Sequence, residues 1–537
     1  MKVKTIAGAL PLGVLWGLPL MAALVLGVVR GVDADAWRAL FEHPQLWPAL
    51  WLSLFTGIAA TGLSLLCTLI ILAGLYRTRL WNALQPMAAA GLALPHLAFA
   101  IGFAFLVAPS GLLARLAVGG TQPPQWSTIQ DPWGLALIAA LVLKEIPFLL
   151  VTGWSALSRG DQAAHLDGQC RAAASLGHGT GSAWLRIVQP QLLSHLRWPL
   201  VIVFVYGSTV VDKALVLGPT QPPTLSLVIW NDLNDAETAT NLRGLAGAFF
   251  MSLALGLMLA ASGLMKTFMA RLARPLLSAG PSLASAPKRV AAILGGGVVL
   301  LSGVVTLLLA VLSVSPRWPY PAIWPPVTGT KAWLSLFATP APLWTSLALA
   351  ATTAVVAVLV AIIWFETQDP SRDRYLLVPA LFSLAIPQLV IGGGQYGLFL
   401  TLGLVGTPTG LFIAHFTPVM AYVAIVLAGP WRGFDNRYMA AARALSSTPL
   451  RNVLRIKLPM LKAPLLTAAA VGFGVSMVQF VPAQLAAAGR YSTLPMEAVT
   501  LTSGGNRSLT AAYALALAIP PLIVFLAAGL LGRPRWR

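Results

Sequence analysis

Four charged side chains lie inside segments that are otherwise apolar. Lys144 and Glu145 shortly precede Pro147 in one such segment, and Asp212 and Lys213 lie in the next. An ionisable group at the centre of a bilayer costs about 2.5–3.5 kcal/mol on insertion scales, so such residues are first considered as functional candidates. If Glu145 or Asp212 lined a path through the membrane, it would favour a cationic cargo.

A structural explanation of these charges stays open beside the functional one. Neighbouring residues of a helix point about 100° apart, so neither adjacent pair is expected to face itself. Pairing across helices would satisfy the charges, as Lys144 with Asp212 or as Glu145 with Lys213. His415 lies in a later apolar segment, where it either lines a path or bonds a backbone carbonyl. The candidate path residues are Lys144, Glu145, Asp212, Lys213 and His415.

The elements that position these residues are predicted to be membrane-spanning helices. Of 537 residues, 57% are hydrophobic and 9% are charged, whereas soluble domains carry about 25% charged residues. Barrel strands are excluded because the apolar runs are continuous and do not alternate. Pro95 and Pro387 are expected to kink the spans that contain them. Twelve stretches approach the roughly 20 apolar residues that a span needs, and they are 6–29, 49–75, 86–107, 133–151, 198–217, 245–265, 290–314, 343–365, 376–402, 411–427, 465–485 and 511–531.

The strong positive charge follows from the membrane topology. The net charge is +19, and most Lys and Arg residues fall in alternate loops between the predicted spans. Cytoplasmic loops of membrane proteins are enriched in these residues, so both termini are predicted to be cytoplasmic. The chain is expected to contact lipid, and its charge requires no nucleic acid. Cys67 and Cys170 are expected to be unpaired thiols, and no metal site is predicted.

The sequence is duplicated internally. A polar, Pro- and Ser-rich stretch near residues 281–288 separates a first half, 1–285, from a second half, 286–537, with six spans in each. An even number of spans gives the two repeats the same orientation, related by an axis along the membrane normal. The matched features are Trp51 and Ser53 with Trp344 and Ser346, Pro95 and Gly102 with Pro387 and Gly394, and Thr224-Leu225 with Thr493-Leu494.

Each half contains one long polar loop, at about 160–196 and about 430–462, and we call these the paired loops. In each, an Ala-rich helical turn is broken and followed by a second amphipathic stretch that leads to a proline. The spacing from Gly177 to Pro190 equals that from Ser446 to Pro459, thirteen residues. A short helix with a small-residue face suits a groove on a partner. Resting on lipid headgroups is the alternative, and the matched repetition favours a partner.

The paired loops resemble the Glu-Ala-Ala (EAA) loop of binding-protein-dependent ABC importer permeases. Arg171 and Ala440 stand where that family has Glu, Gln189 where it has Leu, and Ser446 where it has Gly. Two permease halves in one chain look like the fused permeases of the thiamine and ferric-iron type. The resemblance assigns ATPase docking to the matching residues Ala172, Ala173, Gly177, Ile187 and Pro190 in the first loop, and to Ala441, Ala442, Ile456, Leu458 and Pro459 in the second, together with Ser446 at the position of the family's Gly.

The resemblance implies an all-α integral membrane protein of the type I ABC importer (MetI-like) permease fold in the bacterial inner membrane. It also implies a separate ATPase subunit, as a dimer, and an extracytoplasmic solute-binding protein. The sequence contains no Gly-Lys pair and therefore no phosphate-binding P-loop. The chain is thus expected to bind no cofactor, to be no enzyme itself, and to leave ATP to its partner. The main alternative is a proton- or sodium-coupled secondary transporter, a class that also uses parallel six-helix repeats.

Overall fold

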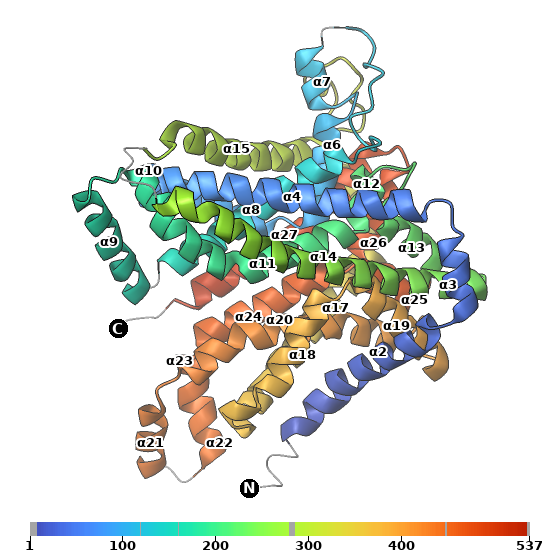
Figure 1. The fold of residues 1–537 in the computed structure, drawn as a ribbon. Coiled ribbons are helices and arrows are strands. Elements are labelled where there is room, and N and C mark those ends of the chain that lie inside the picture. Colours follow the sequence, from blue (N-terminus) through green and yellow to red (C-terminus); the bar gives the residue numbers. More distant parts are fainter. Residues whose placement is uncertain (1–7, 119, 159, 279–284, 446–447, 534–537) are drawn as a thin grey trace. The chain divides into compact units, whose positions relative to one another are not determined.

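The computed structural model describes residues 8–533 except 119, 159, 279–284 and 446–447. All regular elements in these ranges are helices (Figure 1). Nine of the described helices are long and apolar enough to cross a membrane, or up to eleven spans if each of two sharply bent helix pairs is counted as one. The all-α membrane fold predicted from the sequence is confirmed.

The helices form two compact units, which are described separately. Unit 2 comprises Arg38–Asn231 and Ala246–Thr328. Its helices, including the larger parts of α13 and α14, are α4 (Leu46–Leu75), α5 (Arg79–Ala93), α6 (His96–Val107), α7 (Leu112–Ala117), α8 (Leu135–Leu157), α9 (Gly160–Ser175), α10 (Thr180–Ala183), the π-helical turn η2 (Trp184–Val188), α11 (Gln189–Thr209), α12 (Asp212–Leu217), α13 (Leu225–Leu233), α14 (Thr238–Ser278) and α15 (Lys288–Ser313).

Unit 1 comprises Met1–Trp37, Asp232–Leu245 and Gly329–Arg537. Its helices are η1 (Gly13–Gly17), α2 (Leu18–Gly31), α16 (Lys331–Ala338), α17 (Ala341–Thr367), η3 (Pro370–Arg372), α18 (Arg374–Ala385), α19 (Gln388–Leu402), α20 (Pro408–Arg432), α21 (Asn436–Leu445), α22 (Pro449–Asn452), the π-helical turn η4 (Val453–Lys457), α23 (Leu458–Met460), α24 (Lys462–Met477), α25 (Val481–Ala487), α26 (Leu494–Thr502) and α27 (Arg507–Leu531); α3 (Ala34–Phe41) crosses the boundary between the units.

Several predicted spans are interrupted. Pro95 is an extended residue that separates α5 from α6, and it lies directly before α6. Pro387 separates α18 from α19 in the same way. α18 and α19 are consequently bent by 107°. Because proline has no N–H and disfavours a helical residue before it, the predicted kinks become full breaks. The fifth span of the first half, expected at 198–217, also breaks, since α11 ends at Thr209 and α12 begins at Asp212.

The compact units cut across the two sequence halves, because each half contributes its first span to the other unit. η1 and α2 together pack in unit 1, where Trp16 of η1 and Leu20 of α2 share a core with Phe416. α15 packs in unit 2, where Ala291 and Val298 join the core of α4 and α8. The sequence repeat sets 1–285 and 286–537 as halves, whereas packing exchanges their first helices.

The matched glycines explain how the exchanged helices fit. A Cβ at Gly394 of α19 would overlap the carbonyl of Ala23 in α2. In unit 2, a Cβ at Gly102 of α6 would lie 2.7 Å from Val305 and 2.8 Å from Leu309 of α15. Both glycines therefore mark the places where a first helix approaches closely, which small residues permit in membranes.

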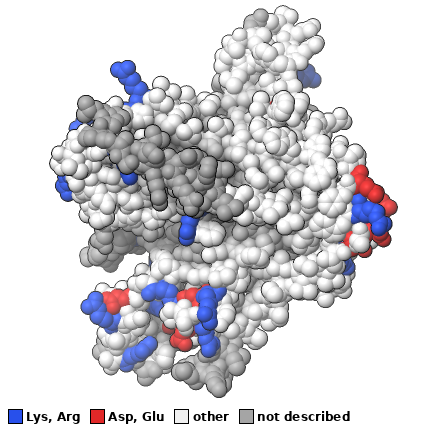
Figure 2. Space-filling view, viewed as in Figure 1, with Lys and Arg blue, Asp and Glu red and all other residues white. Residues whose placement is uncertain are grey.

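Charged groups are sparse on the visible surface. Most of the described surface in Figure 2 carries no Lys, Arg, Asp or Glu, and the charges gather at a few places, among them the region of α21 and α22. A surface with few charged groups is what lipid-facing helices require.

Candidate functional site

The first paired loop folds as two helices joined by a glycine turn. α9 ends after Ser175, and Gly177 adopts φ +84°. The N–H of His178 then donates to the carbonyl of Ala173 at 3.0 Å, and that of Gly177 to Ala174 at 3.0 Å. This is a left-handed C-cap, a conformation that favours glycine. The predicted helix break is confirmed and its cause is the backbone of Gly177.

Corresponding alanines of the two loops have the same burial. Ala173 and Ala442 are buried within their own loops, 7% and 5% exposed. Ala172 and Ala441, one residue earlier, are exposed. Each loop therefore keeps one alanine for its internal packing and leaves the other on an open, small-residue face.

The second helix of each paired loop contains a π-helical turn at the corresponding place. η2 and η4 begin at Trp184 and Val453, the same offset that relates Thr224 to Thr493. Pro190 and Pro459 lie two residues after these π-turns, each as the second residue of the helix that continues from the turn. Apolar groups stay exposed beside them: Leu176 and Leu450 at 70%, Leu185 at 55% and Leu454 at 54%. Ile187, Ile456 and Leu458 are half-buried, and Ser446 lies outside the described residues.

In unit 2, the turn after α4 is tied to both helices of the first paired loop. Arg77 forms an ion pair with Asp167 of α9, with 2.6 Å from Nη1 to Oδ2. The guanidinium lowers the pKa of the Asp167 carboxyl below its ordinary value, chiefly through this hydrogen bond. Tyr76 donates to the carbonyl of Leu157, the last residue of α8, at 3.0 Å, and its ring lies 6.1 Å from that of Trp184 in η2.

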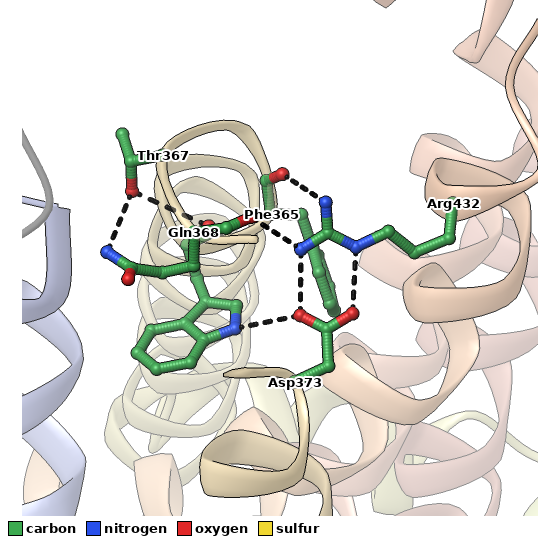
Figure 3. Close-up of polar contacts among 6 residues, drawn as sticks. Phe365, Thr367, Gln368, Asp373 and Arg432 are labelled. Atoms are coloured by element: carbon green, nitrogen blue, oxygen red, sulfur yellow. Dashed lines mark hydrogen bonds and ion pairs between the residues drawn. The ribbon is translucent and has the colours of Figure 1, made fainter. Parts of the chain in front are cut away.

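In unit 1, the end of α17 is tied to α20 and to the second paired loop. Arg432, the last residue of α20, forms two 2.7 Å bonds with the Asp373 carboxylate and donates to the carbonyls of Phe365 and Gln368 at 2.9 Å (Figure 3). Lys457 of η4 lies 2.6 Å from Glu366 of α17. Its ammonium also lies 4.5 Å from the centre of the Trp431 ring, a cation–π contact.

The candidate path residues of the first half gather where helices are broken. Lys144 of α8 donates from Nζ to the carbonyls of Gly91 and Leu94, both at 2.7 Å. Those carbonyls lie at the end of α5 just before Pro95, where no following helical N–H can pair with them. The ammonium therefore caps the broken helix.

A continuous chain of side-chain contacts runs from Glu145 to Asp212. Glu145 lies 3.3 Å from Nε2 of His96, whose ring packs edge-on against Tyr206 with centres 5.4 Å apart. The Lys213 ammonium lies 4.6 Å from the centre of the Tyr206 ring and 3.1 Å from the Asp212 carboxylate. This series of contacts has a carboxylate at each end and the Tyr206 ring at its centre. All five residues belong to unit 2.

The predicted cross-helix pairings are wrong. Lys213 pairs with its neighbour Asp212. The predicted span is broken directly before Asp212, which is the first residue of α12, so the Asp212 side chain is not fixed on one face of a continuous helix. Glu145 pairs with His96, and Lys144 bonds backbone carbonyls instead of a carboxylate.

His415 has a different environment in unit 1. Its Nδ1 lies 2.9 Å from the Ser476 hydroxyl of α24, so the predicted bond to a carbonyl is replaced by one to a side chain. Its Nε2 is buried and has no hydrogen-bond partner among the described residues. The second half thus has an imidazole three residues before Pro418 of α20, where the first half has Lys144 three residues before Pro147.

Two members of the contact chain, His96 and Tyr206, were missed as site residues by sequence reasoning. His96 follows Pro95, and a polar residue directly after a helix-breaking proline in an apolar segment is a usable signal. Tyr206 carries no such signal, since aromatic residues are ordinary in spans.

Comparison with known proteins is consistent with a transport protein. The chain is 30% identical over 516 residues, 94% of this chain and 92% of the relative, to the inner membrane ABC transporter permease protein YnjC of Escherichia coli K12. It is 29% identical over 157 residues to the putrescine transport system permease protein PotI of the same strain, and 24% identical over 119 residues to the spermidine/putrescine transport system permease protein PotC of Haemophilus influenzae. No family model matches the sequence.

The similarities differ in extent. Those to PotI and PotC cover 28% and 22% of this chain and about half of each relative, whereas the similarity to YnjC extends over nearly the full length of both proteins. An all-helical fold of two repeats, with helix breaks and paired polar loops, is consistent with that relationship. The chain belongs to the ABC transporter permeases, as a multi-pass protein of the inner membrane with two fused permease halves.

Proposed function

We propose that this chain is the permease subunit of an ATP-driven importer, with the paired loops as docking elements for a separate ATPase dimer. The observation that carries the proposal is the matched construction of the two loops. Each presents an exposed alanine, Ala172 or Ala441, and an exposed leucine, Leu185 or Leu454, at the same offset. A secondary transporter driven by an ion gradient has no need of two matched docking elements.

The proposal is tested by blocking the exposed alanines. Ala172→Trp and Ala441→Trp should abolish co-purification of the ATPase with the tagged full-length chain. Ala174→Trp and Arg443→Trp are the matched controls, because these residues correspond in the repeat and are also exposed in α9 and α21, but lie about 200° around their helices from Ala172 and Ala441. Retained ATPase in the first pair, or uptake by purified chain on a proton or sodium gradient alone, would contradict the proposal.

We further propose that the side chains in contact between Glu145 and Asp212, namely Glu145, His96, Tyr206, Lys213 and Asp212, line the path of a small organic cation. Two partial relatives bear the names of putrescine and spermidine permeases, and no comparison favours thiamine or iron. Glu145 already pairs with His96 and Asp212 with Lys213, so a cationic cargo would have to displace these partners instead of meeting a bare carboxylate. We expect the cargo to arrive on an extracytoplasmic solute-binding protein, and both termini to be cytoplasmic.

A direct uptake assay tests the cargo class. Proteoliposomes containing the complex are supplied with the binding protein and with radiolabelled putrescine or thiamine. Uptake of putrescine that is lost in Glu145→Gln supports the proposal. Uptake of thiamine but not of putrescine would support a cationic cargo and contradict a polyamine cargo. Competition by an anionic solute would contradict a path for cations.

A further inference from the structure

We infer that α4 and α17 act as rigid rods that carry movement of the paired loops to the short helices α13 and α26, with Ser53, Arg77, Ser346 and Glu366 as positioning residues. The inference rests on the proposed docking of an ATPase. The inference follows from two contacts of each rod: an ion pair with a paired loop at one end, and a hydrogen bond with a short helix nearer the other end. Both kinds of contact occur in each unit.

At one end, each rod is bonded to its paired loop. Arg77, two residues after α4, pairs with Asp167 of the first loop. Glu366, one residue before the end of α17, pairs with Lys457 of the second loop. The acid and base are reversed between the units and the positions do not correspond in the repeat, so the same link has been built twice with different residues.

Nearer its other end, each rod is bonded to the first residue of a short helix. The hydroxyl of Ser53 accepts from the N–H of Leu225, the first residue of α13, at 2.8 Å. The hydroxyl of Ser346 accepts from the N–H of Leu494, the first residue of α26, also at 2.8 Å. All four residues are buried. These N–H groups have no partner inside their own helices, so each rod supplies one.

In unit 2 the link continues to the candidate path. Ser226, next to Leu225, donates from its hydroxyl to the carbonyl of Val210 at 2.9 Å. Val210 lies in the break between α11 and α12, two residues before Asp212. A displacement of α13 therefore acts directly on the backbone that carries Asp212 and Lys213.

The rods are suited to transmit a displacement without bending. From Ser53 to Leu75, the last residue of α4, the helix extends about 33 Å at 1.5 Å per residue. α4 and α17 carry proline only in the first turn, whereas α8, α11, α18, α20 and α27 carry it in the interior. Interior proline is the main cause of sharp helix kinks.

Hydrogen–deuterium exchange of the purified complex tests the rods without knowledge of the cargo. The exchange of residues 225–231 and 494–502 is compared between the nucleotide-free complex and the complex trapped with ADP and vanadate. We expect trapping to change exchange in both segments. Ser53→Ala should remove at least half of the change in 225–231 and leave that in 494–502, and Ser346→Ala should do the reverse.

Ser64→Ala is the matched control, because Ser64 lies in α4, is buried and has no hydrogen-bond partner among the described residues. It should leave both changes intact. Charge reversal gives a second route that does not touch the buried serines. Arg77→Glu should diminish the change in 225–231, and Arg77→Glu with Asp167→Arg should restore it.

The outcomes separate this inference from the proposed function. If no ATPase co-purifies with the wild-type chain, the proposed docking fails and the rods fail with it. If the ATPase co-purifies but trapping changes neither segment, only the rods are overturned. Full nucleotide-dependent changes in folded Ser53→Ala and Arg77→Glu complexes would equally overturn them.

Discussion

The hydroxyl oxygen of Ser53 accepts a hydrogen bond from the backbone N–H of Leu225 at 2.8 Å, across 172 residues of sequence. Ser346 and Leu494 make the same bond in the other unit. Two features are matched between the sequence halves: the serine near the start of the second span and the Thr-Leu pair after the fifth span. In each half, these two features are joined by one buried hydrogen bond. This bond gives the repeated residues a physical reason to recur.

Removing this bond should destabilise the protein. Ser53→Ala leaves the N–H of Leu225 buried without a partner, at a cost of about 1–3 kcal/mol. Ser64→Ala in the same helix removes a hydroxyl that is itself unpartnered among the described residues, so we expect a change near zero. Chemical denaturation of the detergent-solubilised protein measures both, and equal effects would show that the bond contributes nothing.

The exchanged first helix should depend on glycine in α19. Gly394→Ala places a Cβ against the Ala23 carbonyl and should cost about 1–3 kcal/mol through overpacking. Gly303→Ala in α15 meets nothing within 4 Å and should be neutral or stabilising by up to about 1 kcal/mol. Thermal unfolding of the two variants is the measurement, and a neutral Gly394→Ala would contradict the close packing of α2 on α19.

The turn in the first paired loop should depend on Gly177. Its φ of +84° is unfavourable for any residue with a Cβ, so Gly177→Ala should cost about 1–2 kcal/mol and loosen the loop locally. Gly179, at φ −70°, is the matched control. Limited proteolysis should cut the 160–196 loop faster in Gly177→Ala than in Gly179→Ala, and equal rates would argue against the left-handed cap.

Asp212 and Lys213 can be tested as a structural pair and as a path. Asp212→Asn leaves the buried ammonium of Lys213 without its carboxylate and should cost about 3–5 kcal/mol. Asp212→Asn with Lys213→Gln should restore most of that stability. If the pair is only structural, the double variant also recovers uptake. If it lines the path, stability returns in thermal unfolding while uptake stays lost.

The ion pair of Arg77 and Asp167 predicts a small acid sensitivity of the first loop. Because Arg77 lowers the pKa of Asp167 in the folded protein, the stabilisation is fully present above the ordinary carboxyl pKa and is lost as pH falls below it. Both side chains are half exposed, so the effect is about 0–1 kcal/mol. The difference in thermal midpoint between wild type and Asp167→Asn should shrink as pH falls from 7 to below 4; a constant difference would contradict the pairing.

The sequence by itself determined the membrane class, the duplication and the paired loops. These follow from properties that depend on local pattern: long apolar runs, constant offsets between matched residues, and an Ala-rich turn followed by helix-breaking residues. The positions of the helix breaks at Pro95 and Pro387 were also visible, although proline's effect was underestimated as a kink.

Only the tertiary structure decided which residues meet. The exchange of first helices, the partners of Lys144 and Glu145, and the bond from Ser53 to Leu225 all join positions that are far apart in sequence. An apolar span can pack against any other span of suitable shape, because lipid and protein interiors are similarly apolar and hydrophobicity does not select among them. The choice is made by close contacts at glycine and by buried polar groups that must find partners, and both depend on three-dimensional placement.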